Sequence, residues 1–197
     1  MPLGNRVKTD DLGTTYKSEI YPLGTTYVQI ASEVAGIDLL KADGTTAFTV
    51  ATDSASNLQQ GDRVWMFVEA GEAITAGDLC KIDTTAAGTP YKIHRADAAG
   101  TYTYLLRGVA QFDIASGEYG WICIKGTVVV QAAAAVAAGD SLQSTTTAGE
   151  VAAITVNYGA SPAVVVPSVV GVALDEEAAG SRYGAGFCQA IVDVSNL

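Results

Sequence analysis

The chain has 197 residues, a length that suits one domain with a substantial core, and 21 acidic against 11 basic residues give a net charge of −10. Lys and Arg are scattered without a basic run, which disfavours nucleic-acid binding because a phosphate backbone requires clustered cations, and no apolar run is long enough to span a membrane. Charged residues make up only 16% of the chain, which favours a surface that other protein chains partly cover.

Residues 1–30 differ in composition from the rest of the chain. Tyr16, Tyr21 and Tyr27 lie in a loop-like stretch that also holds Pro2 and Pro22. Because aromatic side chains require a surface to bury against, we expect an extended N-terminal arm that is ordered by docking on its own domain or on a neighbouring subunit. An edge hairpin of the domain is the alternative. Residues 31–197 are predicted to form a β domain, with a short helix at 30–41 as one option.

Strand-like runs follow at 63–68, 79–82, 102–112, 121–130, 164–174 and 187–194. Residues 121–130 are apolar on both faces, which predicts a central, covered strand, and Lys125-Gly126 predicts a bulge or turn within it. Pro167 marks an edge or a break, because proline cannot donate a ladder hydrogen bond. Residues 131–138 are rich in alanine, yet we expect them to be extended. Short strands separated by Gly, Asp, Thr and Ser predict an all-β fold, a compact β-barrel or sandwich.

Two stretches of the chain, 71–130 and 132–194, resemble each other. Ala73-Ile74-Thr75-Ala76-Gly77-Asp78 recurs as Ala135-Val136-Ala137-Ala138-Gly139-Asp140, Arg107-Gly108-Val109-Ala110 as Val170-Gly171-Val172-Ala173, and Gly120-Trp121-Ile122-Cys123 as Gly186-Phe187-Cys188-Gln189. The offsets are 62, 63 and 66 residues (73 to 135, 107 to 170 and 120 to 186). The repeated positions are turns and strand starts, so the sequence predicts a β domain built from two related units.

No catalytic or metal-binding constellation emerges from the sequence. His94 is the single histidine, and its setting indicates a polar strand or loop face. The cysteines are Cys80, Cys123 and Cys188, an odd number without CxxC spacing, so we predict neither a disulfide framework nor a zinc site, and we expect Cys123 and Cys188 to be buried. Gly-Asp at 77–78 and 139–140 indicates turns, and Asp175-Glu176-Glu177 a solvated loop. We predict no cofactor and no enzymatic activity.

The Gly-bearing motifs at 76–79, 107–110 and 120–126, together with their second copies, resemble the decoration (cement) proteins of tailed-bacteriophage capsids. The resemblance covers roughly residues 60–194 and leaves 1–59 unsupported. It implies a structural virion protein that binds the outer surface of an icosahedral capsid and clamps neighbouring capsomers. The implied partners are the major capsid protein and further copies of the chain, commonly as a homotrimer, with no nucleic acid or membrane. The first residues have no apolar leader, so we expect synthesis in the host cytoplasm.

Two alternatives stay open. One is a carbohydrate- or host-binding β module, which would expose Trp65 or Trp121, although their apolar flanks predict that both are buried. The other is a β-clip-type enzyme with an intersubunit site, which would require a base beside Cys80 or His94 in an open cleft. For the structural role, the residues expected to make capsid or subunit contacts lie in the arm: Pro2, Leu3, Tyr16, Tyr21, Leu23 and Tyr27.

Overall fold

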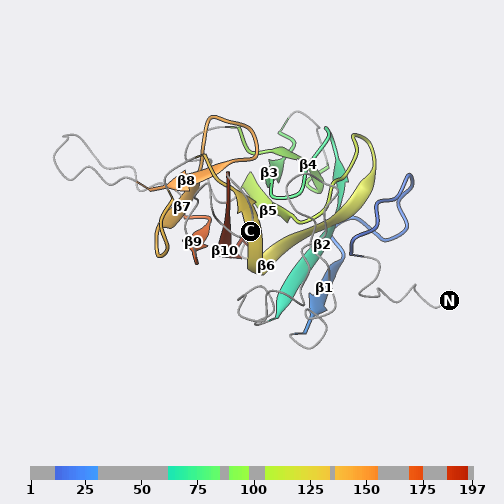
Figure 1. The fold of residues 1–197 in the computed structure, drawn as a ribbon. Helices are drawn as coiled ribbons and strands as arrows, with labels where there is room; N and C mark the ends of the chain where they lie inside the picture. Colours follow the sequence, from blue (N-terminus) through green and yellow to red (C-terminus); the bar gives the residue numbers. More distant parts are fainter. Residues whose placement is uncertain are drawn as a thin grey trace.

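The computed structural model describes residues 12–30, 62–84, 89–97, 105–133, 136–154, 169–174 and 186–194. In these residues every regular element is a strand, so the all-β prediction is confirmed, and the strands form a ten-stranded sheet in the order β1-β2-β4-β3-β5-β6-β10-β9-β7-β8 (Figure 1). The strands are β1 (Thr26–Gln29), β2 (Arg63–Ala70), β3 (Leu79–Ile82), β4 (Lys92–Arg95), β5 (Leu106–Ala110), β6 (Tyr119–Gln131), β7 (Ser141–Ser144), β8 (Val151–Ala153), β9 (Gly171–Ala173) and β10 (Phe187–Asp193).

The sheet closes on itself in its first half. β2 pairs in parallel with β4, β4 and then β5 pair antiparallel with β3, and β5 pairs antiparallel with the N-terminal half of β6. β6 also pairs antiparallel with β2, from Val64↔Lys125 to Glu69↔Tyr119. These pairings return to the starting strand and form a ring, which we call the first ring.

The second half of the sheet repeats this set of pairings. The C-terminal half of β6 pairs antiparallel with β10, β10 with β9, β9 with β7, and β7 with β8. A parallel bridge between Ala132 and Val151 links β8 back to the end of β6 and closes the second ring. Each pairing of the first ring therefore has a counterpart of the same direction in the second, and β6 belongs to both.

The strand register places the last repeated motif differently from the sequence comparison. Val68 pairs with Gly120 in the first ring, and Val130, which lies 62 residues further along (68 to 130), pairs with Cys188 in the second. Gly120 of the first ring therefore corresponds to Cys188 of the second, an offset of 68 residues (120 to 188). The comparison of sequence motifs had instead matched Gly120 with Gly186. A shift of two residues leaves every side chain on the same face of a strand, so the apolar pattern cannot detect it.

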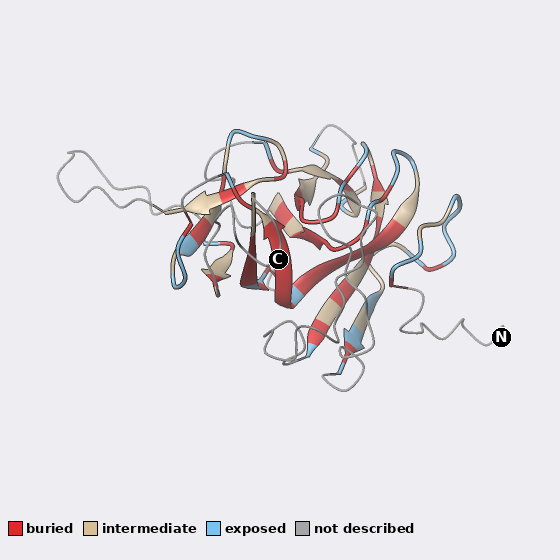
Figure 2. Ribbon diagram, in the orientation of Figure 1, coloured by how far each residue is buried: buried red, intermediate tan, exposed pale blue. Residues whose placement is uncertain are grey.

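β6 holds the two rings together, as its sequence predicts for a central strand. Nearly all of its residues are buried (Figure 2), and β2, β5 and β10 flank it. The predicted irregularity at Lys125-Gly126 is confirmed: the register between β2 and β6 shifts beside Lys125, where Val64 faces Lys125 and Trp65 faces Cys123. The strand leaves β2 at this point and continues with β10 alone.

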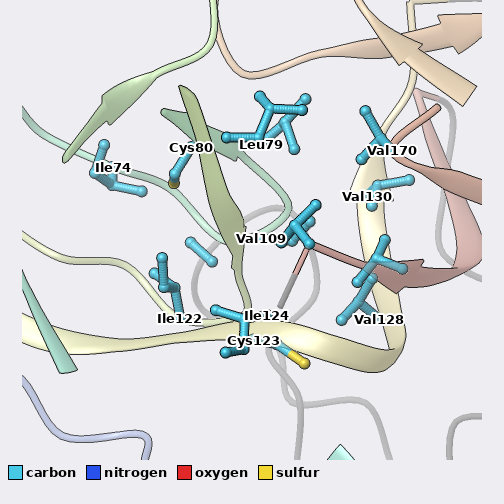
Figure 3. Packing of buried hydrophobic residues seen from close by; sticks show 14 of the residues in the cluster. Ile74, Leu79, Cys80, Val109, Ile122, Cys123, Ile124, Val128, Val130 and Val170 are labelled. Atoms are coloured by element: carbon cyan, nitrogen blue, oxygen red, sulfur yellow. The ribbon is translucent and has the colours of Figure 1, made fainter. Parts of the chain in front are cut away.

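The buried apolar side chains form one cluster that runs through both rings (Figure 3). Trp65 and Trp121 are buried in it, as predicted. The free thiols of Cys80, Cys123 and Cys188 are buried as well, which confirms the prediction for Cys123 and Cys188. The cluster therefore does not separate into one core for each ring.

The remaining sequence-based predictions concern short strands or segments outside the described residues. The strands β1, β4, β7 and β8 have three or four residues each and were not predicted as separate elements. Residues 131–133 and 136–138 are not helical, as expected for an extended connection. The possible helix at 30–41, Pro167 and Asp175-Glu176-Glu177 lie outside the described residues, apart from position 30.

Candidate functional site

Residues 12–30, which we call the N-terminal segment, run along the outside of the first ring beside β2 and β6. The amides of Tyr16 and Tyr119 each donate to the carbonyl oxygen of the other at 2.8 Å. Further along, β1 pairs antiparallel with β2, from Thr26↔Met66 to Gln29↔Arg63. Backbone hydrogen bonds therefore fix the segment at both of its ends.

Aromatic packing holds the middle of the N-terminal segment. Tyr21 is 7% exposed, and its ring lies 5.4 Å from that of Phe67, nearly perpendicular to it, and 5.4 Å from that of Trp121. The ring of Tyr16 lies 6.1 Å from Phe67. Such edge-to-face and tilted arrangements suit the charge distribution of aromatic rings.

Four of the six residues expected to make intermolecular contacts therefore contact their own chain. Tyr21 belongs to the core, and Tyr16, Leu23 and Tyr27 are half-buried against it. Pro2 and Leu3 lie outside the described residues. Intermolecular contact by the arm stays a prediction.

Three large apolar side chains of the N-terminal segment are exposed. In β1 the side chain of Gln29 points inward, where its Oε1 accepts a hydrogen bond from Trp65 Nε1 at 3.0 Å. Val28 and Ile30 alternate with it and are 54% and 51% exposed, and Ile20 is 36% exposed. These three residues were not among the predicted contact residues, although the alternation of apolar and polar side chains at Val28, Gln29 and Ile30 is typical of a strand whose two faces differ.

The two Gly-Asp motifs form matching turns, as predicted. Asp78 Oδ2 accepts from the Thr75 amide at 2.7 Å, and Asp140 Oδ2 accepts from the Ala137 amide at 2.8 Å. The amide of the glycine before each aspartate donates at 2.8 Å to the carbonyl of Ala110 in one ring and of Ala173 in the other. Each aspartate thus closes its own turn, which is a structural task.

The surroundings of the two turns differ. Residues 76–79 of the first turn are buried, and residues 137–139 and 141 of the second are exposed. The difference arises because the turn between β7 and β8 packs on the first: the Leu79 amide donates to the carbonyl of Gly149, and the Gly149 amide donates to that of Ala96, both at 2.8 Å. The two rings therefore dock at Asp78.

Charged side chains of β4 pair with residues of neighbouring segments. His94 Nε2 is 3.3 Å from Asp83 Oδ2, and Lys92 Nζ is 2.7 Å from Glu69 Oε1. Glu72 accepts from the Arg95 amide at 2.7 Å; partial burial opposes ionisation, but the bonds and charge of Arg95 outweigh it and lower the pKa of Glu72. These pairs tie neighbouring strands together at a half-exposed surface.

Cys80 and His94 do not form a nucleophile–base pair. Cys80 is opposite Arg95 in the β3–β4 ladder and Lys81 is opposite His94, so the thiol and the imidazole point to opposite faces of the sheet. Burial raises the pKa of Cys80 well above its ordinary value, and burial raises that of Cys123 to about 12. Both thiols are held in their unreactive form.

Over the described ranges, no group of three or more His, Cys, Asp or Glu side chains is arranged to hold a metal ion. In the same part of the chain, no helix has the length and apolar character needed to cross a membrane.

Comparison with known proteins identifies the family. The profile of the phage cement proteins matches residues 58–188, from the approach to β2 through both rings to the start of β10. This chain belongs to the phage cement protein family. Among solved structures, the N base of the head fiber of bacteriophage phi29 is similar at 18% identity, with a TM-score of 0.47 over 68% of this chain and 98% of that chain. No curated protein sequence matches the chain.

The cement protein is thus a structural protein of a phage virion, associated with the capsid, as the motifs in the repeated units implied. The family match covers β2 to β9 and the first two residues of β10, and it does not reach the N-terminal segment, which lies before residue 58. The match therefore rests on the two-ring body, and the N-terminal segment lies outside it.

Proposed function

We propose that this cement protein binds the outer surface of an icosahedral phage capsid as a homotrimer and clamps neighbouring capsomers. It is made in the host cytoplasm and adds to the assembled shell, with the major capsid protein as its partner. A protein that binds only the assembled shell stabilises that state by mass action, and repeated copies add avidity. This role requires neither a cofactor nor catalysis.

The observation that best supports the proposal is that the N-terminal segment packs on its own domain through some residues and exposes apolar side chains at others. Its tyrosines pack on the first ring, so the strand they anchor has a defined position, and its opposite side presents Val28 and Ile30. Exposed apolar side chains on a fixed strand suit a protein interface, because their burial is favourable and little conformational entropy is lost on binding. We place the main capsid contact on this side of the segment, and we propose that Pro2 and Leu3 contribute to capsid binding as well.

A capsid co-sedimentation assay tests the contact. The double substitution V28D/I30D places two charges in the proposed interface, and we expect it to weaken capsid binding at least tenfold, on the order of 1.4 kcal/mol. Ile191→Asp is the matched control, because Ile191 is 48% exposed on β10, which is separated from β1 by β2 and β6. Both variants should keep the melting temperature of the wild type to within a few degrees.

The outcomes separate the parts of the proposal. Wild-type protein that never sediments with capsids would reject the capsid role altogether. Full binding by V28D/I30D would move the contact away from the N-terminal segment. Deletion of residues 1–11 asks whether Pro2 and Leu3 contribute, and light scattering coupled to size exclusion tests the trimer, which a monomeric mass would refute.

The two alternative functions have less support. A carbohydrate-binding face would use exposed tryptophans, whereas Trp65 and Trp121 are buried. A nucleophile–base pair of Cys80 and His94 would need the two side chains on one face, whereas they lie on opposite faces of the sheet, and burial raises the pKa of the Cys80 thiol.

A further inference from the structure

Asp78 lies where the two rings meet. The backbone bonds of Gly149 with Leu79 and Ala96 dock the β7–β8 turn of the second ring on the first. The approach is so close that a Cβ on Gly149 would lie 2.1 Å from Asp78 Oδ1. The carboxyl group therefore faces the docked turn directly.

The docked turn leaves this carboxyl group with little solvation. Asp78 is 1% exposed. Its Oδ2 accepts hydrogen bonds from the Thr75 amide at 2.7 Å and from Thr75 Oγ1 at 2.8 Å, both within its own turn. From the described residues no hydrogen bond reaches Oδ1, the oxygen that faces Gly149.

The charges around Asp78 only partly offset its burial. Burial raises the pKa of Asp78, against the hydrogen bonds of Thr75 and the charge of Arg95, while the charge of Glu72 raises it further. On β3 and β4, Lys81 and His94 point to the opposite face of the sheet from Cys80 and Arg95. The titratable groups near Asp78 include Glu72, Cys80, Arg95, Asp113 and Glu150. Of these, Asp113 accepts from the Ala76 amide and Glu150 Oε1 from Gln131 Nε2.

We propose that Asp78 makes the docking of the two rings depend on protons: with the carboxyl group neutral the β7–β8 turn stays docked, and ionisation favours its release. A buried carboxyl that holds its proton more strongly in the closed state adds stability to that state at low pH. This stability is lost as the pH rises through the closed-state pKa. The junction therefore weakens as the pH rises above the ordinary aspartate pKa of about 3.9, a property separate from capsid binding.

Hydrogen exchange of the Leu79 amide, which donates across the junction, measures the opening. After correction for intrinsic exchange, we expect protection to fall as the pH rises from about 4 to about 7, by at most about tenfold per pH unit. In Asp78→Asn this dependence should disappear, because asparagine keeps an acceptor for Thr75 but cannot ionise. Asp140→Asn is the matched control: its turn has the same carboxylate–amide bond but carries no docked hairpin in the described structure, so the dependence should remain.

Either of two results overturns the proposal. One is a wild-type Leu79 protection factor that does not change with pH, and the other is an unchanged dependence in Asp78→Asn. If Asp78→Asn fails to fold, the carboxyl resonance of Asp78 in the wild type can be titrated by NMR. A midpoint above the ordinary aspartate value of about 3.9 supports the proposal, and a midpoint at or below that value rejects it.

Discussion

At the scale of single residues, two glycines with the same backbone conformation have different surroundings. Gly149 and Gly139 have φ values of 85° and 91°, where a side chain is strained. A Cβ on Gly149 would collide with Asp78, whereas a Cβ on Gly139 would meet nothing within 4 Å. Conformation is therefore matched between the two sites, and only packing differs.

Alanine substitution separates these two costs. Gly139→Ala should lower the free energy of unfolding by about 1 kcal/mol through backbone strain. Gly149→Ala should lower it by about 3 kcal/mol, because overpacking at the ring junction adds to the same strain. Urea denaturation of both variants measures the difference. Equal losses of unfolding free energy would show that the ring junction accommodates the added methyl group without further destabilisation.

Single residues were also where the sequence was most informative. The burial of Trp65 and Trp121 followed from their apolar flanks, and the roles of Asp78 and Asp140 followed from turn chemistry that acts within four residues. The carboxylates beside His94 could not be predicted, because Asp83 and Glu72 reach it from other segments. Sequence alone shows only the neighbouring cations Lys92 and Arg95.

At the scale of elements, the N-terminal segment is both part of the first ring's core and a candidate interface. Tyr21→Ala should cost about 3 kcal/mol of stability, because it removes a buried ring from Phe67 and Trp121. Val28→Ala, on the exposed side of the same segment, should stay within about 0.5 kcal/mol of the wild type. Thermal denaturation checks both values, and a small loss for Tyr21→Ala would mean that the segment adds little to the fold.

Long strands were easier to predict from the sequence than short ones. The apolar run of β6 identified a central strand and its irregularity, because thirteen residues leave few other interpretations. β7 and β8 are too short for a period of two to show. The N-terminal segment could be recognised by its tyrosines, but the face that each residue presents depends on the register of β1 against β2, a contact between distant parts of the chain.

At the scale of the whole molecule, the shared strand β6 couples the rings. Because one strand and one continuous core serve both, we expect a single unfolding transition in calorimetry. Ile93→Ala in the first ring and Leu142→Ala in the second should each cost about 3 kcal/mol and lower the same transition, measured at equal protein concentration. A second, separate transition in Leu142→Ala would show that the rings unfold independently.

The buried turn at Asp78 and the exposed turn at Asp140 differ in the residue that a docked unit would cover. After the aspartate, the first turn continues with Leu79, which is fully buried beneath the second ring, and the second turn continues with exposed Ser141. A third unit added in tandem would have to bury that serine where the existing contact buries a leucine. The second turn therefore offers a polar residue where the first offers an apolar one, so a unit that docked on it in the same way would gain less from apolar burial.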